Sequence, residues 1–118
     1  MERMTLSKEE RLCGRDSVAE LFAHGKSLSA GCFRCRFLAN GTEQRRFMVS
    51  VPKRSFKRAV KRNLLKRRIR EAYRQQKALL PSGTDILFVY TATEVLEYNE
   101  IYAAVGEALS AVNNALQP

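Results

Sequence analysis

Several features on which enzymes and membrane proteins depend are missing from this 118-residue sequence. It has no tryptophan and one histidine. It also has no run of 18 or more apolar residues, so no membrane-spanning helix is expected. His24 precedes Gly25 at the end of a predicted helix, where capping is a commoner role than catalysis. No GxSxG, P-loop or HExxH string occurs, and the acidic residues are scattered. The sequence therefore indicates no protein-borne catalytic groups and no metal cluster.

Cysteine is scarce too, and the spacing of Cys13, Cys32 and Cys35 excludes the usual metal frameworks. Cys32 and Cys35 have a C-x-x-C spacing, but no second cysteine or histidine pair follows. Alternation along a strand would place these two side chains on opposite faces, which favours small core thiols over a metal or redox centre. Residues 1–12 are charged where a signal peptide needs an apolar segment. We therefore expect a cytoplasmic protein that binds no cofactor itself.

The charge is strongly positive and unevenly distributed. Lys and Arg number 21 against 12 Asp and Glu, which gives a formal net charge of +9. Residues 45–77 contain 14 of the basic residues and one acid, Glu71, whereas residues 78–118 contain five acids and no Lys or Arg. Such segregation produces a directed electric field and predicts a polyanionic partner. The length and composition fit one domain that spans residues 1–118.

Residues 16–24 predict a short helix near the N-terminus. Asp16 or Ser17 provides its N-cap, and Gly25 provides its stop. The apolar residues that share one face of this helix are Val18, Leu21 and Phe22.

Alternating segments then predict half-buried strands. Residues 32–38 place three apolar side chains on one side and two arginines on the other; these are Phe33, Cys35 and Phe37, opposite Arg34 and Arg36. Asn40 and Gly41 mark a turn. Residues 47–51 alternate in the same way, and Pro52 ends this second strand.

Residues 56–80 contain no glycine or proline and predict one long amphipathic helix. Its apolar half consists of Val60, Leu64, Leu65, Ile69 and Ala72. Three residues do not fit this division, and one of them is Lys61, which falls on the apolar half. Arg68 falls on the apolar half, where it could pair with Glu71, and Tyr73 falls on the basic half, where it could stack on RNA or flank the core.

The other half of this predicted helix is almost purely cationic. Its basic residues face one acid, so like charges repel unless an anionic partner neutralises them. Arginine outnumbers lysine, which suits bidentate contacts with phosphates.

The rest of the chain predicts a strand and a helix. Residues 85–91 form an unalternating apolar run, typical of a central strand covered on both faces, and residues 98–116 have helical spacing. The order is helix, two or three strands, long helix, strand, helix. This order indicates an α/β or α+β domain with helices packed on one sheet.

The basic segment resembles a known family. Residues 51–74 read VPKRSFKRAVKRNLLKRRIREAYR, which is similar to the signature of the bacterial ribonuclease P protein component. That signature has a strand ending in Ser-Val, a basic pair, and then Ala-Val-x-Arg-Asn-Arg-x-Lys-Arg-x-x-Arg-Glu on a long helix. The matching positions are Ser50, Val51, Lys53, Arg54, Ala59, Val60, Arg62, Asn63, Lys66, Arg67, Arg70 and Glu71. Residues 6–12 and 85–89 also resemble family segments.

The sequence departs from the family at two positions. The family's Arg-Asn-Arg triplet ends here in Leu64, so one phosphate contact is lost or transferred to Lys61 or Arg68. Where the family often has a second aromatic residue in its substrate cleft, this chain has Val18. Stacking there should be weaker, and the charge of Arg36 could compensate.

The resemblance implies a fold of order αβββαβα: an α+β two-layer sandwich with one sheet, helices packed on it, and a left-handed β-α-β crossover. It implies the protein subunit of a ribonucleoprotein endoribonuclease that removes the 5′ leader from precursor tRNA. The catalytic groups and the Mg²⁺ ions are then expected in the RNA subunit. The implied partners are ribonuclease P RNA and precursor tRNA, with no membrane or DNA partner.

The resemblance also assigns two binding surfaces. The basic segment would bind the catalytic RNA, through Lys53, Arg54, Lys57, Arg58, Lys61, Arg62, Asn63, Lys66, Arg67, Arg70 and Arg74. A cleft between the first helix and the sheet would hold the single-stranded leader by stacking and phosphate contact. Its predicted residues are Phe22, Phe33, Arg36 and Val18.

Other readings of the charge pattern stay open. Charge alone does not name the RNA, so a non-catalytic RNA-binding module, such as a small ribosomal or assembly protein, is the alternative function. A DNA reader is disfavoured because Asn63 is the one base-reading amide within the basic stretch of residues 53–74, and no helix-turn-helix precedes it. A membrane-surface role is disfavoured because the helix needs its apolar half to cover the sheet.

Overall fold

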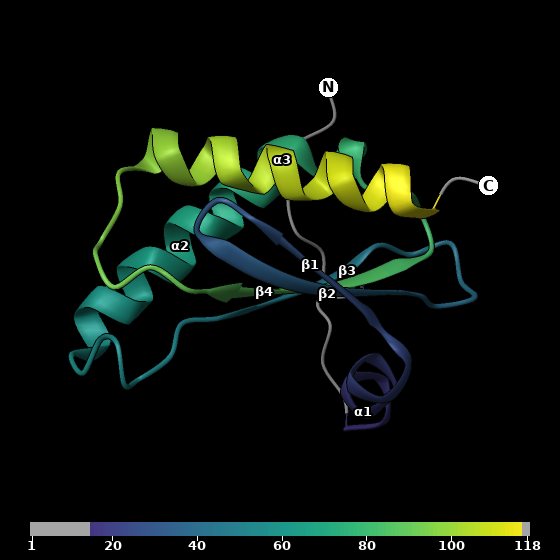
Figure 1. Ribbon diagram of the computed structural model, residues 1–118, viewed down its shortest axis with the longest axis horizontal. Helices are drawn as coiled ribbons and strands as arrows, with labels where there is room; N and C mark the ends of the chain where they lie inside the picture. The colour runs from purple at the N-terminus through teal and green to yellow at the C-terminus, as the bar shows by residue number, and fades with distance from the viewer. Residues whose placement is uncertain (1–14, 117–118) are drawn as a thin grey trace.

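The computed structural model describes residues 15–116 and contains one four-stranded sheet with three α-helices (Figure 1). The elements are α1 (Arg15–His24), β1 (Lys26–Ala30), β2 (Phe33–Ala39), β3 (Arg46–Ser50), α2 (Ala59–Gln76), the 3₁₀ helix η2 (Lys77–Leu79), β4 (Thr84–Tyr90) and α3 (Tyr98–Leu116). This is the αβββαβα order that the family resemblance implies.

The sheet is mixed, with strand order β1-β2-β4-β3. β2 runs antiparallel to both β1 and β4, whereas β3 runs parallel to β4, with α2 as the crossover between them. β4 is therefore a central strand, and six of its seven residues are buried. This confirms the interpretation of its continuous apolar run as a strand covered on both faces.

One face of the sheet is closed by α2 and α3, which together cover the main core. α3 lies across this side in Figure 1, with α2 beside it. The aromatic residues Phe33, Phe47 and Phe88 of the strands belong to the same buried cluster as residues of these two helices. Phe33 meets Phe88 edge to face, with ring centroids 5.2 Å apart. Tyr73 stacks on Phe47 at 4.2 Å and is fully buried. The structure thus assigns Tyr73 to the core, which was one of its two predicted roles, and leaves no exposed ring there for stacking on RNA.

The opposite face of the sheet carries α1 and a much smaller apolar cluster. Leu21 of α1 and Leu87 of β4 are its buried members, with Val18, Leu38 and Val89 half-buried around them. Gly25 ends the helix as predicted, because a Cβ at this position would lie 2.3 Å from the Leu21 carbonyl oxygen.

The predicted N-cap of α1 is wrong. The helix already includes Arg15, so Asp16 and Ser17 lie inside it rather than before it. The Ser17 hydroxyl accepts a 3.3 Å hydrogen bond from Arg46 of β3, so it links the helix to the sheet.

A buried ion pair joins the ends of β3 and β4 beneath this link. Arg46 donates from Nε and Nη2 to the two carboxylate oxygens of Asp85, at 2.7 and 2.8 Å. Asn40, next to the predicted turn, donates to the same carboxylate at 2.7 Å. Asp85 is 2% exposed, so these donors replace the water that the buried charge has lost.

Candidate nucleic-acid interface

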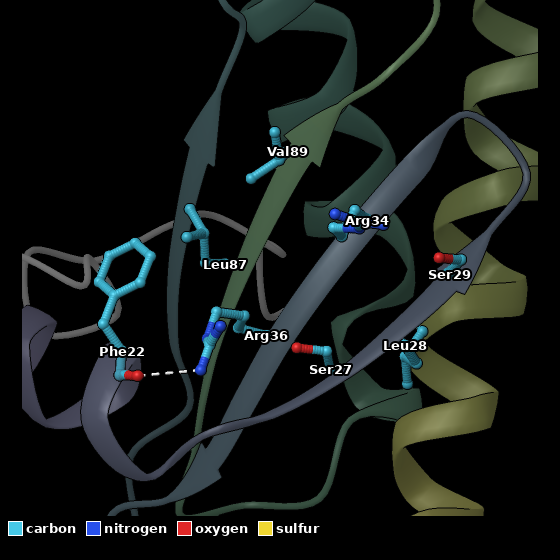
Figure 2. Close-up of a pocket in the computed structure, with 8 residues that line it drawn as sticks. All are labelled: Phe22, Ser27, Leu28, Ser29, Arg34, Arg36, Leu87 and Val89. Atoms are coloured by element: carbon cyan, nitrogen blue, oxygen red, sulfur yellow. Dashed lines mark hydrogen bonds between the residues drawn. The ribbon is translucent and has the colours of Figure 1, made fainter.

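A cavity of about 380 Å³ lies between the end of α1 and the open face of the sheet (Figure 2). Apolar and cationic side chains are mixed in its lining, which consists of Phe22, Ser27, Leu28, Ser29, Arg34, Arg36, Leu87 and Val89. Phe22 is 53% exposed, and its ring stands beside the Leu87 and Val89 side chains of β4. An exposed ring, an apolar floor and two arginines can stack a base and neutralise a phosphate.

Two of the four predicted cleft residues line this cavity and two do not. Phe22 and Arg36 line it as expected. The structure contradicts the assignment of Phe33, which is 1% exposed on the other face of the sheet because strand neighbours alternate. Val18 packs half-buried against the Leu21 and Leu87 cluster and does not line the cavity.

Sequence reasoning left most of the cavity floor unidentified. Arg34 is separated from Arg36 by two positions, so the predicted alternation of β2 already placed it on the same face. Leu87 and Val89 could not be assigned to this face from the sequence, because β4 is apolar throughout and has no alternation that shows which side chains lie on which face of the sheet.

The exposed side of α2 and the loop before it present most of the predicted RNA-binding residues to solvent. Those classed as exposed are Lys53, Arg54, Lys57, Arg58, Lys61, Asn63, Arg67 and Arg70, and Lys66 is half-buried. The helix has no acid in its first turn, so nothing there reduces the positive field of its N-terminus.

Three arginines of α2 are bound within the fold: Arg62, Arg68 and Arg74. Arg62 donates from Nη1 to the carbonyl oxygens of Phe56 and Lys57, at 2.7 and 2.9 Å, and so holds the loop that precedes the helix. Arg68 donates to the Leu96 carbonyl oxygen at 2.5 Å. Arg68 therefore links α2 to the segment before α3. The pairing of Arg68 with Glu71 that the sequence suggested is not formed.

Glu71 instead pairs with Arg74, one helical turn later. Arg74 donates from Nε to the Glu71 carboxylate at 2.9 Å, and a second contact joins Nη2 to the other oxygen. Hydrogen bonds from Arg74 and then Gln75 lower the pKa of Glu71 to about 2, and the same pairing raises the pKa of Arg74. The one acid of the basic segment thus stays ionised and partly offsets the charge near the end of α2.

The start of α2 differs from its predicted pattern. Val60, predicted in the apolar half, is 78% exposed, because the first turns of the helix extend past the sheet (Figure 1). Leu64, which replaces the family's arginine, is half-buried. Of the two residues expected to compensate for it, Arg68 is bound to Leu96, whereas Lys61 is exposed beside a second cavity of about 440 Å³.

Of the two described cysteines, Cys35 is buried in the main core and Cys32 is half-buried against it. Burial raises the pKa of Cys35 to about 12 and that of Cys32 to about 11. A thiol with such a pKa is almost entirely protonated near neutral pH and is a poor nucleophile or metal ligand. Within residues 15–116 no three His, Cys, Asp or Glu side chains converge as a metal site. Cys13 lies outside the described residues.

Comparison with known proteins identifies the family. A family model described as Ribonuclease P matches residues 6–113. The chain belongs to this family. The ribonuclease P protein component of Porphyromonas gingivalis is 39% identical over 104 residues, which cover 85% of this chain and 66% of that relative. The Thermotoga maritima component is 38% identical over 85 residues, 72% of each chain.

Solved structures of ribonuclease P proteins share the fold. The Thermotoga maritima protein superposes with a TM-score of 0.77 at 28% identity, covering 86% of this chain and 96% of that one. A Staphylococcus aureus ribonuclease P protein gives the same TM-score at 23% identity, which supports the fold alone. None of the helices in the described part of the ribonuclease P domain has the length and apolar character needed to span a bilayer.

Proposed function

We propose that this chain is the protein subunit of a ribonuclease P ribonucleoprotein, which removes the 5′ leader from precursor tRNA. The observation that carries the proposal is the exposed cationic surface of α2 and its preceding loop, in a chain of the ribonuclease P family. Catalytic groups and Mg²⁺ ions then belong to the RNA subunit. The protein would act in the cytoplasm, where precursor tRNA is found.

The two surfaces divide the work of binding. The exposed cations of α2 contact the phosphates of ribonuclease P RNA, and the cavity beside α1 holds the single-stranded leader. Each neutralised phosphate raises affinity and lowers the demand of the folded RNA for divalent cations. The protein therefore contributes by positioning the scissile phosphate, without supplying a nucleophile.

A cleavage assay at low Mg²⁺ tests this function. Ribonuclease P RNA is incubated with precursor tRNA, with and without the protein, and the 5′ end of the product is mapped. We expect accurate cleavage when the protein is present and little without it. Binding of the RNA without stimulation of cleavage would support the alternative, a non-catalytic RNA-binding module.

Two arginines of α2 provide a matched test of the RNA surface. Arg67 is exposed, whereas Arg68 is bound to Leu96. Arg67→Gln should reduce the slope of log K for RNA binding against log salt by about 0.9 and leave stability unchanged. Arg68→Gln should lower the free energy of unfolding by about 1 kcal/mol and leave the slope unchanged. Equal slopes for both variants would contradict the assignment of the α2 surface.

A further inference from the structure

Two arginines of β2 line the cavity beside α1 but stand in different surroundings (Figure 2). Arg34 and Arg36 lie on the same face of the strand, about 7 Å apart along it. Arg34 is exposed, and among the residues that the structure describes it has no hydrogen-bond or ion-pair partner. Arg36 is half-buried, and its guanidinium is engaged by α1. The same side-chain type is thus free in one case and bound in the other.

The guanidinium of Arg36 sits at the C-terminal end of α1. Its Nη2 donates to the Phe22 carbonyl oxygen at 2.9 Å and lies 3.4 Å from the Gly25 carbonyl oxygen. These carbonyls have no partner within the helix, and the negative end of the helix dipole favours a cation there. The dashed line in Figure 2 marks the contact with Phe22.

Arg36 also contacts the ring of the residue whose carbonyl it binds. Its guanidinium carbon lies 5.5 Å from the centroid of the Phe22 ring, within range of a cation–π interaction. A second nitrogen of the guanidinium, Nε, is shielded from solvent and has no partner among the described residues. Arg36 therefore restrains both the backbone and the ring of Phe22, through Nη2 and through the face of its guanidinium, and both contacts would be disturbed if the group turned toward a ligand in the cavity.

From this geometry we infer that Arg36 is a positioning residue that fixes the Phe22 ring for stacking, and that Arg34 makes the phosphate contact in the cavity. The inference rests on the proposed function, in which the cavity holds the leader of precursor tRNA. A phosphate that drew the guanidinium of Arg36 into the cavity would break its contacts with the helix end, whereas Arg34 has no hydrogen bond or ion pair with the described residues to lose.

Substitutions that keep or remove charge distinguish the two roles. The affinity of the reconstituted ribonucleoprotein for precursor and for mature tRNA is measured over a range of salt concentrations. Arg34→Gln should reduce the salt slope for precursor tRNA by about 0.7, the value for one contact with a single strand. Arg36→Lys keeps the charge but not the planar fork. It should weaken precursor binding about two- to fivefold, the size of an exposed cation–π contact, with no change in slope.

A double-mutant cycle tests whether Arg36 acts through Phe22. If it does, Phe22→Leu combined with Arg36→Lys should weaken precursor binding no more than Phe22→Leu alone. A merely structural role would lower the unfolding temperature without this non-additivity, so unfolding is followed for every variant. Lys26→Gln is the charge control, because Lys26 is exposed on β1 and does not line the cavity.

The possible results distinguish a failure of the inference about Arg34 and Arg36 from a failure of the proposed leader-binding function. Additive effects in the cycle, or a reduced slope for Arg36→Gln with an unchanged slope for Arg34→Gln, would overturn the inference. The Arg34→Gln result stands alone if an Arg36 variant does not fold, because Arg34 makes no hydrogen bond or ion pair with the described residues of α1. If the unsubstituted protein gives no preference for precursor over mature tRNA, it is the proposed leader-binding function that fails.

Discussion

The two faces of the sheet use the same four strands but differ in what covers them. On one face, α2 and α3 enclose a continuous core of aromatic and aliphatic side chains. On the other, α1 covers a small cluster around Leu21 and Leu87 and leaves the adjoining strand surface open. Apolar area removed from water stabilises the fold at about 25 cal/mol per Å². The first face therefore supplies most of the stability, and the second can keep an exposed ring and free charge for binding.

The comparison of the two faces shows why Phe22 and Phe33, which are close in the sequence, have different roles. Phe33 lies in the enclosed core, 1% exposed, and Phe22 lies at the cavity, 53% exposed. Both are near the first helix and the first long strand, and both fit a general picture of a ring-lined cleft. The face of the sheet, rather than proximity in the sequence, decides which ring a ligand can reach.

The largest expected effect is on the enclosed face. Phe33→Ala should lower the free energy of unfolding by about 3–5 kcal/mol, because it removes a ring that packs against Phe88 and Tyr90. Phe22→Ala should change it by less than about 0.5 kcal/mol, because half of its ring is already in water. Urea unfolding of both variants measures the difference. Similar losses of stability would show that the two faces are not distinct.

The next expected effect is at the Arg46–Asp85 ion pair, which lies on the face of the sheet that carries α1. Asp85→Asn removes a buried charge and turns an amide donor toward Arg46 or Asn40, which are donors themselves. Because Arg46 is 25% exposed, we expect a loss of about 2–3 kcal/mol, below the range for a fully buried pair. Glu107→Gln, which neutralises an exposed carboxylate on α3, is the control and should have little effect. Thermal unfolding should rank these variants in that order.

The sequence was sufficient for most of the fold because its patterns follow burial closely. Alternation in β2 and the continuous apolar run of β4 correctly predicted a half-buried and a central strand. The final helix has the bounds 98–116 that its spacing predicted. β1 had no comparable signal, since the edge strand reads KSLSA and its serines and lysine are exposed. The identity of the strand neighbours also depends on long-range pairing, which periodicity does not encode.

Errors in the candidate site came from treating the long helix as a uniform cylinder on a uniform surface. Val60 is exposed because the sheet does not extend beneath the first turns of α2. Tyr73 is buried because its long side chain reaches the Phe47 ring, a contact that a projection of Cα positions misses.

The assignment of Phe33 to the cleft has a different origin. It follows from family resemblance alone, although the alternation of β2 puts Phe33 on the face opposite Arg36.

The smallest expected change in stability accompanies the most specific change in binding. Phe22→Leu should alter the free energy of unfolding by less than about 0.5 kcal/mol, because Phe22 is 53% exposed and leucine keeps part of its apolar contact. It should weaken binding of precursor tRNA about fivefold, toward the lower end of the range for losing one base stack, since leucine keeps some apolar contact. Binding of mature tRNA, which has no leader, should not change.

Met48 provides the matched control for this last prediction. It is 36% exposed and pairs in register with Leu87, so it lies on the same face of the sheet as Phe22 without lining the cavity. Met48→Leu should leave the affinities for precursor and mature tRNA unchanged. If Phe22→Leu reduced both affinities equally, or if Met48→Leu reproduced its selectivity, the open face would be a general apolar surface, because a specific leader site depends on the placement of one ring.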